Sequence, residues 1–462
     1  MCDRSSTQIL EMELLVCLTF FFLLSTASPL NDVSHNSCSS KFKDELHHIN
    51  GSALHLTLHH PRSPCSPAPF PTLPFSAIFS HDEARVQSLA SRISKTRPRA
   101  SSPLLRPDAV SVPLSQGTSI GVGNYVARIG LGTPPKSYVV VVDTGSSLSW
   151  VQCSPCRVYC HSQVGSVFDP SGSATYRPVS CTSPECDGLE SATLNPSACS
   201  MSNVCIYEAT YGDSSFSVGY LASDTLSIGR GKSLSNFIYG CGQDNEGLFG
   251  RSAGLIGLDR NRLSLLSQLA PISGYSFTYC LPTTSSAGYL SIGSYNPGQF
   301  SYTPMLSNSL DDALYFIRLT GITVAGRGLP VSTSAYTSAP TIIDSGTVIT
   351  RLPPDVYDAL SGAVAAALKG SPRAPAYSIL DTCFVGSASR LAVPAVEMVF
   401  QGGATLKLPP RNVMVDVDDS TTCLAFAPAG EVAIIGNKQQ QTFSVVYDVG
   451  RSRIGFAAGG CR

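Results

Sequence analysis

One short pattern occurs twice in this chain and constrains its fold more than any other feature. It reads VVVVDTGS over 139–146 and TIIDSGT over 341–347, about 200 residues apart. In each copy an apolar run typical of a buried strand ends at an acid, Asp143 or Asp344. The glycine that follows permits a tight turn, and the flanking hydroxyls can hydrogen-bond the carboxylate and hold its orientation. Two copies predict two related lobes that each supply one acid to a shared centre.

A second duplication supports this interpretation. Two aliphatic residues and a glycine follow each acid by about 90 to 110 residues, as Leu255-Ile256-Gly257 and Ile434-Ile435-Gly436. From Val112 onward the chain otherwise consists of short β-prone runs separated by Gly, Pro and Ser, which indicates an all-β fold of sandwiches or barrels. Helices should be few. The clearest is predicted from Pro354 to Lys369, with Gly370 as its C-cap.

Histidine and charge exclude several classes of function. Seven of the eight histidines precede residue 112, so only His161 is left in the remaining 350 residues. A Ser-His or Cys-His enzyme would have one candidate base there, and a histidine-rich metal site would have too few ligands. The chain has 31 Lys+Arg against 32 Asp+Glu, which provides no general attraction to nucleic acid or anionic membranes.

The N-terminal region has the composition of segments that are removed before function. The run from Leu14 to Leu24 is apolar and too short to span a bilayer, and small residues follow it up to Ala27. We therefore expect a signal peptide over 1–27. Residues 28–112 are rich in Pro, Ser and His, and they include a basic amphipathic helix predicted from Asp82 to Lys95. These charges would suit a solvated helix face followed by a flexible linker, but after a signal peptide we favour a propeptide whose cations cover an acidic cleft in the rest of the chain.

These motifs together resemble the pepsin-like (A1) aspartic proteases, in particular the plant group of nepenthesin-like and chloroplast-nucleoid-type proteases. The likeness runs from Gly123 to Cys461 and rests on GLGTPPKSYVVVVDTGSSLSWVQC, YGDSSFSVG, GLIGL, TIIDSGT and AIIG. It implies an all-β bilobal fold, with two β-barrel-like lobes and the active-site cleft between them. The N-terminal lobe, with a cysteine-rich insertion, would span 113–310, and the C-terminal lobe 311–462.

The resemblance also implies roles for individual residues. Asp143 and Asp344 would be the catalytic pair of an aspartic endopeptidase, and the group expected to bind substrate is Gly145, Tyr211, Gly346 and Thr347. Ser146 and Thr347 would orient the carboxylates, and Thr144 and Ser345 would bond across the lobe interface. Tyr211 matches the tyrosine of a mobile flap, and Trp150 matches its hydrogen-bonding partner. The flap has Ser214 where pepsin has a glycine.

Paired carboxylates suit peptide hydrolysis without further groups. Two carboxyls close together do not both ionise, so one can accept a proton from water while the other donates one to the substrate. The pair titrates as a unit, which predicts an acidic pH optimum. We expect peptide or protein substrates, no cofactor, no metal, no nucleic-acid partner, no membrane association after signal removal, and a monomer.

Twelve of the sixteen cysteines lie between Cys153 and Cys461. Cys153-x-x-Cys156 with Cys160-His161 would also suit zinc or a redox pair, but in a secreted chain structural disulfides are expected. Spacing does not choose the connectivity. The resemblance implies six bridges: Cys153–Cys156, Cys160–Cys241, Cys181–Cys205, Cys186–Cys199, Cys280–Cys461 and Cys383–Cys423.

Two other functions are compatible with this sequence. Plant relatives of this fold act as inhibitors of other hydrolases, which would make the chain a catalytically silent binding protein. Nucleoid-type relatives suggest DNA binding, for which the basic cluster from Arg85 to Arg106 is the support. For the protease we expect the secretory pathway and the extracellular space or apoplast, with vacuole and plastid as other destinations.

Overall fold

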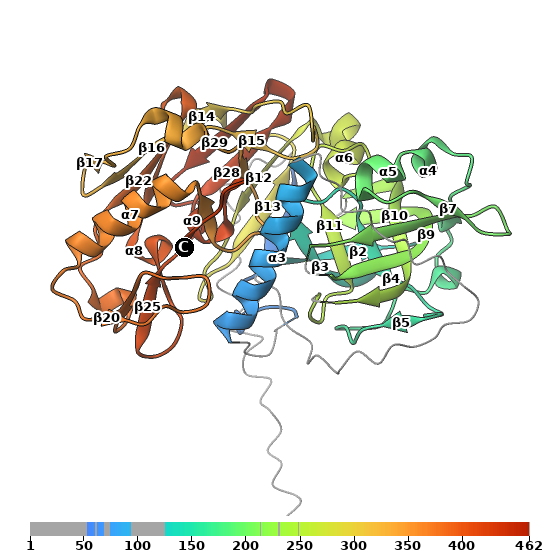
Figure 1. Ribbon diagram of the computed structural model, residues 1–462. Coiled ribbons are helices and arrows are strands. Elements are labelled where there is room, and N and C mark those ends of the chain that lie inside the picture. Colours follow the sequence, from blue (N-terminus) through green and yellow to red (C-terminus); the bar gives the residue numbers. More distant parts are fainter. Residues whose placement is uncertain are drawn as a thin grey trace, which may run out of the picture. The chain divides into compact units, whose positions relative to one another are not determined.

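Two half-chains that supply one acidic strand each are the framework of the fold. The computed structural model describes residues 53–60, 62–68, 74–93, 125–212, 214–229, 232–247 and 249–461, all in the unit His48–Arg462 (Figure 1). The predicted signal peptide over 1–27 lies outside these residues, as does part of the predicted propeptide. No helix in the described part of the chain is long and apolar enough to cross a membrane.

The first half is built around a ten-stranded sheet. Its strands are, in spatial order, β5 (Tyr159–Cys160), β10 (Lys232–Glu246), β4 (Trp150–Gln152), β11 (Gly254–Gly257), β3 (Lys136–Asp143), β2 (Val126–Leu131), β9 (Phe216–Ile228), β8 (Cys205–Thr210) and β7 (Ala198–Cys199), with β6 (Arg177–Pro178) on β9. The valines of β3 face alternately into two hydrophobic clusters, Val140 and Val142 into one and Val139 and Val141 into the other. Burial on both faces explains why this strand is apolar throughout rather than alternating.

The second half has three smaller sheets. One contains β15 (Phe316–Ile317), β18 (Thr341–Ile343), β27 (Ala433–Ile435), β19 (Thr350–Leu352) and β26 (Phe426–Pro428). The second contains β17 (Arg327–Gly328), β16 (Leu319–Val324), β22 (Val396–Phe400) and β23 (Thr405–Leu408), and the third β20 (Arg373–Ala374), β21 (Cys383–Val385), β25 (Thr421–Leu424) and β24 (Met414–Asp416). Each half therefore contains a strand that leads to an acid, but the sheets around these two strands differ between the halves.

A six-stranded sheet joins the two halves. Its order is β1 (Leu54–Leu58), β13 (Gly288–Ile292), β12 (Ser276–Cys280), β28 (Ser444–Asp448), β29 (Arg453–Ala457) and β14 (Ser301–Pro304). The two C-terminal strands β28 and β29 thus lie between β12 and β14, which come from the middle of the chain. The edge strand β1 comes from the region predicted to be propeptide, where no strand was expected.

The duplicated motifs pair in the same way in both lobes. Strand β11 runs parallel to β3 with Gly257 opposite Asp143, and β27 runs parallel to β18 with Ile435 opposite Ile343. The glycine after each aliphatic pair lets the acidic loop pack closely against the strand end. A Cβ on Gly257 would lie 2.3 Å from the backbone oxygen of Ser147, and a Cβ on Gly436 would lie 2.8 Å from the backbone oxygen of Val348. The sequence-level prediction of an all-β, two-lobe fold is confirmed.

The helices are short except for two. The predicted helix at Pro354 is confirmed as α7 (Pro354–Ala367), although Leu368 rather than Gly370 is its C-cap. The predicted propeptide helix is α3 (Phe75–Ile93), which begins seven residues before the expected Asp82 and lies between the strands of the two lobes (Figure 1). The remaining α-helices among the described residues are α4 (Pro184–Asp187), α5 (Leu189–Thr193), α6 (Leu265–Ser273), α8 (Pro410–Val413) and α9 (Asn437–Gln440).

Four of the six expected disulfide pairings are wrong. The structure contains Cys280–Cys461 and Cys383–Cys423, as the resemblance implied. In place of Cys153–Cys156, Cys160–Cys241, Cys181–Cys205 and Cys186–Cys199, it contains Cys153–Cys241, Cys156–Cys160, Cys181–Cys199 and Cys186–Cys205.

Strand register accounts for the difference. Parallel pairing of β4 with β10 places Val151 opposite Cys241, which brings the Cα atoms of Cys153 and Cys241 to 5.3 Å. Cys199 and Cys205 lie opposite each other in the β7–β8 pair, and they bond outward to Cys181 and Cys186 respectively. Cys160, which precedes His161, is bonded to Cys156, so neither of these two cysteines has a free thiol to bind zinc.

The first prediction concerns this connectivity. After tryptic digestion without reduction, the peptide 137–157 should be covalently attached to the peptide 233–251, because Cys153 bonds to Cys241. Mass spectrometry of the linked peptides, with a reduced sample as control, checks this. Release of 137–157 on its own, with 233–251 attached only to the peptide that carries Cys160, would show that the resemblance-based pairing is right.

Candidate active site

Asp143 is the last residue of β3 and is completely buried. The turn after it folds back on the carboxylate: the Gly145 N–H donates to Asp143 Oδ1 at 3.0 Å and the Ser146 hydroxyl to Oδ2 at 2.8 Å. Each carboxylate oxygen therefore has its own donor, which fixes the orientation of the side chain.

Asp344 follows β18 and has the same surroundings in the other lobe. The Gly346 N–H donates to Asp344 Oδ1 at 3.1 Å and the Thr347 hydroxyl to Oδ2 at 2.6 Å. Asp344 is 1% exposed. The repeated sequence pattern thus becomes a repeated hydrogen-bonding pattern.

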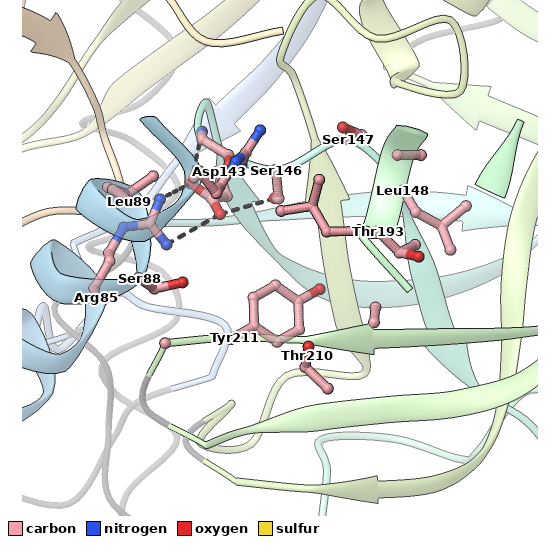
Figure 2. A pocket seen from close by; sticks show the side chains of 16 residues that line it. Arg85, Ser88, Leu89, Asp143, Ser146, Ser147, Leu148, Thr193, Thr210 and Tyr211 are labelled. Atoms are coloured by element: carbon pink, nitrogen blue, oxygen red, sulfur yellow. Dashed lines mark hydrogen bonds and ion pairs between the residues drawn. The ribbon is translucent and has the colours of Figure 1, made fainter. Parts of the chain in front are cut away.

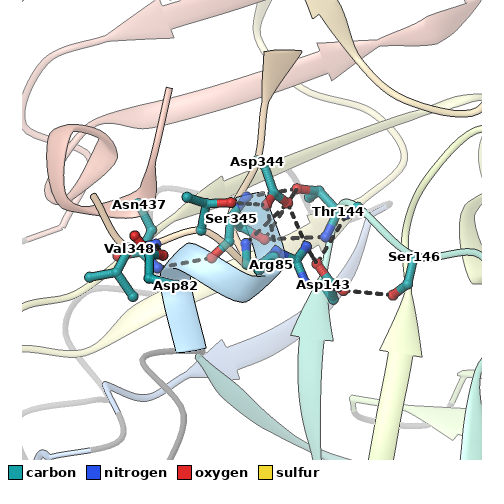
Figure 3. A network of polar contacts seen from close by, with 12 residues as sticks. Asp82, Arg85, Asp143, Thr144, Ser146, Asp344, Ser345, Val348 and Asn437 are labelled. Carbon is teal, nitrogen blue, oxygen red and sulfur yellow. Dashed lines mark hydrogen bonds and ion pairs between the residues drawn. The ribbon is translucent and has the colours of Figure 1, made fainter. Parts of the chain in front are cut away.

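The two acidic loops are joined by the hydroxyl residues at their second positions (Figure 3). The Ser345 N–H donates to Thr144 Oγ1 at 2.8 Å, and the Thr144 N–H donates to Ser345 Oγ at 3.3 Å. Both residues are buried. This reciprocal pair connects loops that are 201 residues apart in sequence and keeps the two acids side by side.

The hairpin between β8 and β9 carries Tyr211 toward the same region. The Trp150 indole N–H donates to the Tyr211 hydroxyl at 2.8 Å, and both rings pack edge-on against Phe249. At the tip of the hairpin Ser214 has a φ of 66°, a left-handed conformation that favours glycine. The serine noted in the sequence therefore occupies a position at which pepsin's glycine would be less strained.

An arginine of α3 lies between the two acids. Arg85 Nη2 contacts Asp143 Oδ1 at 2.7 Å and Asp344 Oδ1 at 3.0 Å, while its Nε contacts Asp344 Oδ2 at 2.8 Å. One guanidinium nitrogen is thus shared by both carboxylates. The sequence indicated a basic segment over an acidic cleft, but it did not single out Arg85. The sequence feature that could have identified Arg85 is its position next to the apolar face of the predicted helix.

The electrostatics of the three groups are coupled. Burial alone would favour the neutral form of Asp344, but the Arg85 charge and the hydrogen bonds from Arg85, Thr347 and Gly346 outweigh it and lower the pKa of Asp344. Burial likewise disfavours the charged guanidinium, but the two carboxylates outweigh it and raise the pKa of Arg85. Each charge is therefore stabilised by the others rather than by water.

Two further side chains of α3 attach the helix to the lobes. Arg92 Nε pairs with Asp311 at 2.8 Å, and its Nη1 donates to the Gly145 carbonyl at 2.9 Å. Asp82 is buried and accepts hydrogen bonds from the backbone after Thr347. Beside the helix a pocket of about 70 Å³ is lined by Arg85, Leu89, Asp143, Ser146, Thr193 and Tyr211, among others (Figure 2).

The structure therefore brings together every residue that the sequence nominated around the acids. The residues that touch the carboxylates are Gly145, Ser146, Gly346 and Thr347. Thr144 and Ser345 join the loops, and Tyr211, whose hydroxyl accepts from Trp150, lines the pocket. Within the described ranges, no group of three or more His, Cys, Asp or Glu side chains has the geometry to hold a metal ion.

Comparisons with known proteins agree with this geometry. Residues 125–294 match the family model described as xylanase inhibitor N-terminal, and residues 314–458 match xylanase inhibitor C-terminal. An aspartyl protease family protein of Arabidopsis thaliana is 40% identical over 390 residues, which cover 83% of this chain and 82% of that protein. The aspartic proteinase nepenthesin-2 of Nepenthes gracilis is 35% identical over 356 residues, which cover 74% of this chain and 78% of the relative.

Solved structures support the fold. The crystal structure of edgp matches with a TM-score of 0.58 at 24% identity, over 73% of this chain and 92% of that one. The crystal structure of basic 7S globulin from soybean matches with a TM-score of 0.58 at 23% identity, over 72% of this chain and 93% of the globulin chain. The two family models and the sequence relatives show that the chain belongs to the plant pepsin-like (A1) aspartic protease family.

Proposed function

We propose that this chain is an aspartic endopeptidase that uses Asp143 and Asp344 to activate water, and that it is made as a secreted zymogen. The observation that carries the proposal is the pair of buried carboxylates on reciprocally bonded loops, with one guanidinium between them. Six disulfides in the described residues suit an oxidising compartment.

The chemistry follows from bringing two carboxyls together. Once Arg85 leaves, the two acids share a proton, because two negative charges at this separation are unfavourable. The ionised member takes a proton from a bound water as the water attacks the peptide carbonyl. The protonated member polarises the carbonyl oxygen and later gives its proton to the leaving nitrogen.

The surrounding residues would hold the peptide for this reaction. Tyr211 and Trp150 would close the β8–β9 hairpin over an extended substrate, bound through backbone hydrogen bonds. The loops at Gly145, Gly346 and Thr347 would line the floor of the site beside the carboxylates.

Helix α3 makes the described form latent. Arg85 occupies the position between the carboxylates that the attacking water requires, and Arg92 covers the Gly145 carbonyl. The segment 28–112 would therefore act as the propeptide, and the lobes over 113–310 and 311–462 would form the mature enzyme.

The silent-inhibitor alternative receives less support from these residues. The family models carry the name xylanase inhibitor, but both acids here keep the complete set of hydrogen bonds that orients a catalytic carboxylate. DNA binding is weakened as well, because Arg85 and Arg92 are engaged by carboxylates and the chain after residue 112 has 21 Lys+Arg against 23 Asp+Glu.

The second prediction tests the two acids. Asp143→Asn or Asp344→Asn should each lower kcat at least about a hundredfold, because an amide neither accepts the proton of water nor donates one to the leaving group. Peptide-library digestion by the acid-treated chain measures this. Asp355→Asn, at an exposed acid of α7, serves as the control and should keep the wild-type rate. Full activity of Asp344→Asn would contradict a catalytic role for this acid, whereas absence of cleavage by the acid-treated wild type would support the silent-binder alternative.

The third prediction concerns activation. The pairing with Arg85 lowers the pKa of Asp344 below its ordinary 3.8. It therefore stabilises the latent form fully above that value, and the stabilisation is lost as the pH falls through the lowered pKa. The chain should stay intact between pH 5 and 7 and lose its N-terminal segment only below about pH 3.8.

Arg85→Gln removes this contact and should shift processing to higher pH, with peptide cleavage already visible at pH 5. Mass spectrometry of the N-terminal segment and a fluorogenic peptide assay follow the two effects. Gln87→Ala, at an exposed position of the same helix, should behave as the wild type. Identical pH thresholds for Arg85→Gln and the wild type would contradict a latching role for this arginine.

A further inference from the structure

A carboxylate of α3 is buried just beyond the second acidic loop. The Asp82 side chain has no exposed surface, and its oxygens accept from the Val348 N–H at 2.5 Å and from the Ile349 N–H at 3.1 Å. Its Oδ2 also pairs with Arg351 Nη2 at 3.0 Å. These partners begin one residue after Thr347, which orients Asp344, so the contact adjoins the catalytic loop (Figure 3).

The three donors that hold Asp82 form a built anion site. Two successive backbone N–H groups and one guanidinium converge on a single carboxylate, and such charge-assisted bonds are the stronger ones. Arg351 belongs to β19, which is paired on both sides with β26 and β27, so the sheet fixes its backbone. Its side chain is 1% exposed.

The site would lose its occupants when α3 leaves. In the part of the chain that the structure describes, both carboxylates paired with Arg351 belong to that helix: Asp82, and Glu83 at 3.2 Å. Arg351 Nε has no hydrogen-bond partner among the described residues even with the helix in place. A largely buried guanidinium without an anion is costly, so the processed cleft would present a site that favours a new carboxylate.

We propose that Val348 N–H, Ile349 N–H and Arg351 form a substrate subsite for an acidic side chain, with Arg351 as the specificity-determining residue. This inference rests on the proposed proteolytic function and names a class of substrate for it: peptides with Asp or Glu near the scissile bond. In the unprocessed chain the Asp82 carboxylate occupies this subsite, and the Arg85 guanidinium occupies the position of the attacking water between the two catalytic acids.

The helix also indicates where the acidic residue should lie. Asp82 and Arg85 are three residues apart on one helix face, which places their Cβ atoms about 5–6 Å apart. In an extended peptide, side chains on one face recur every second residue at about 6.6 Å. The acidic side chain should therefore be fixed about two residues from the scissile bond. Glu83, which is 41% exposed, shows that a second carboxylate reaches the same guanidinium from the solvent side.

The fourth prediction tests this subsite in the full chain after acid processing. Two peptides that differ only by Glu or Gln at the position selected from a peptide library should differ about tenfold in kcat/KM, in favour of Glu. The assay is run at pH 5.5, above the ordinary glutamate pKa of about 4.3, so that the peptide carboxylate is ionised.

Arg351→Gln should reduce the Glu/Gln ratio to near one, and Arg351→Lys should retain part of it because the charge remains. Both peptides are assayed on the same sample, so a partly folded variant does not alter the ratio. Arg373→Gln removes an exposed arginine of β20 as the matched control and should leave the ratio unchanged.

The outcomes separate the two proposals. A wild-type ratio near one, or a ratio that Arg351→Gln does not change, overturns the subsite while leaving the protease intact. Absence of any cleavage that depends on Asp143 and Asp344 overturns the proteolytic function, and the subsite with it.

Discussion

The shared guanidinium between Asp143 and Asp344 is the interaction on which the rest of this structure depends. Two carboxylates with almost no exposed surface have no bulk water to stabilise a negative charge, so they depend on the hydrogen-bond donors and cations packed against them. Arg85 supplies the missing positive charge from a helix outside both lobes. The same geometry that makes the acids suited to share a proton thus makes them a binding site for α3.

The lobes exist in their present arrangement because each must deliver one acid to this centre. In both lobes a short parallel partner, β11 or β27, supports the acidic strand. The Thr144–Ser345 pair then joins the loops, and the six-stranded sheet joins the half-chains on a larger scale. Helix α3 reaches both lobes through Arg85 and Arg92, and the C-terminal lobe alone through Asp82, so its departure would uncover charged groups on both sides of the dyad.

Local sequence patterns were sufficient to predict the two acids, the main strands and the longer helices. Asp143 and Asp344 were found because strand, acid, hydroxyl and glycine are neighbours in the chain. The cysteine pairings failed because they depend on the register of β4 with β10 and of β7 with β8, which spacing does not encode. The roles of Arg85 and Arg351 were likewise inaccessible, since their partners lie 58 to 269 residues away. Long-range charge pairing is where this sequence was least informative.

Direct binding to the dyad tests the central claim without relying on turnover. A peptide analogue that carries a transition-state-mimicking hydroxyl should occupy the space between the carboxylates, and calorimetry at pH 6 measures its affinity for the intact chain. We expect no measurable binding to the unprocessed wild type and clear binding to Arg85→Gln, lost again when Asp344→Asn is added. Equal binding to wild type and Arg85→Gln would contradict the claim that Arg85 closes the dyad.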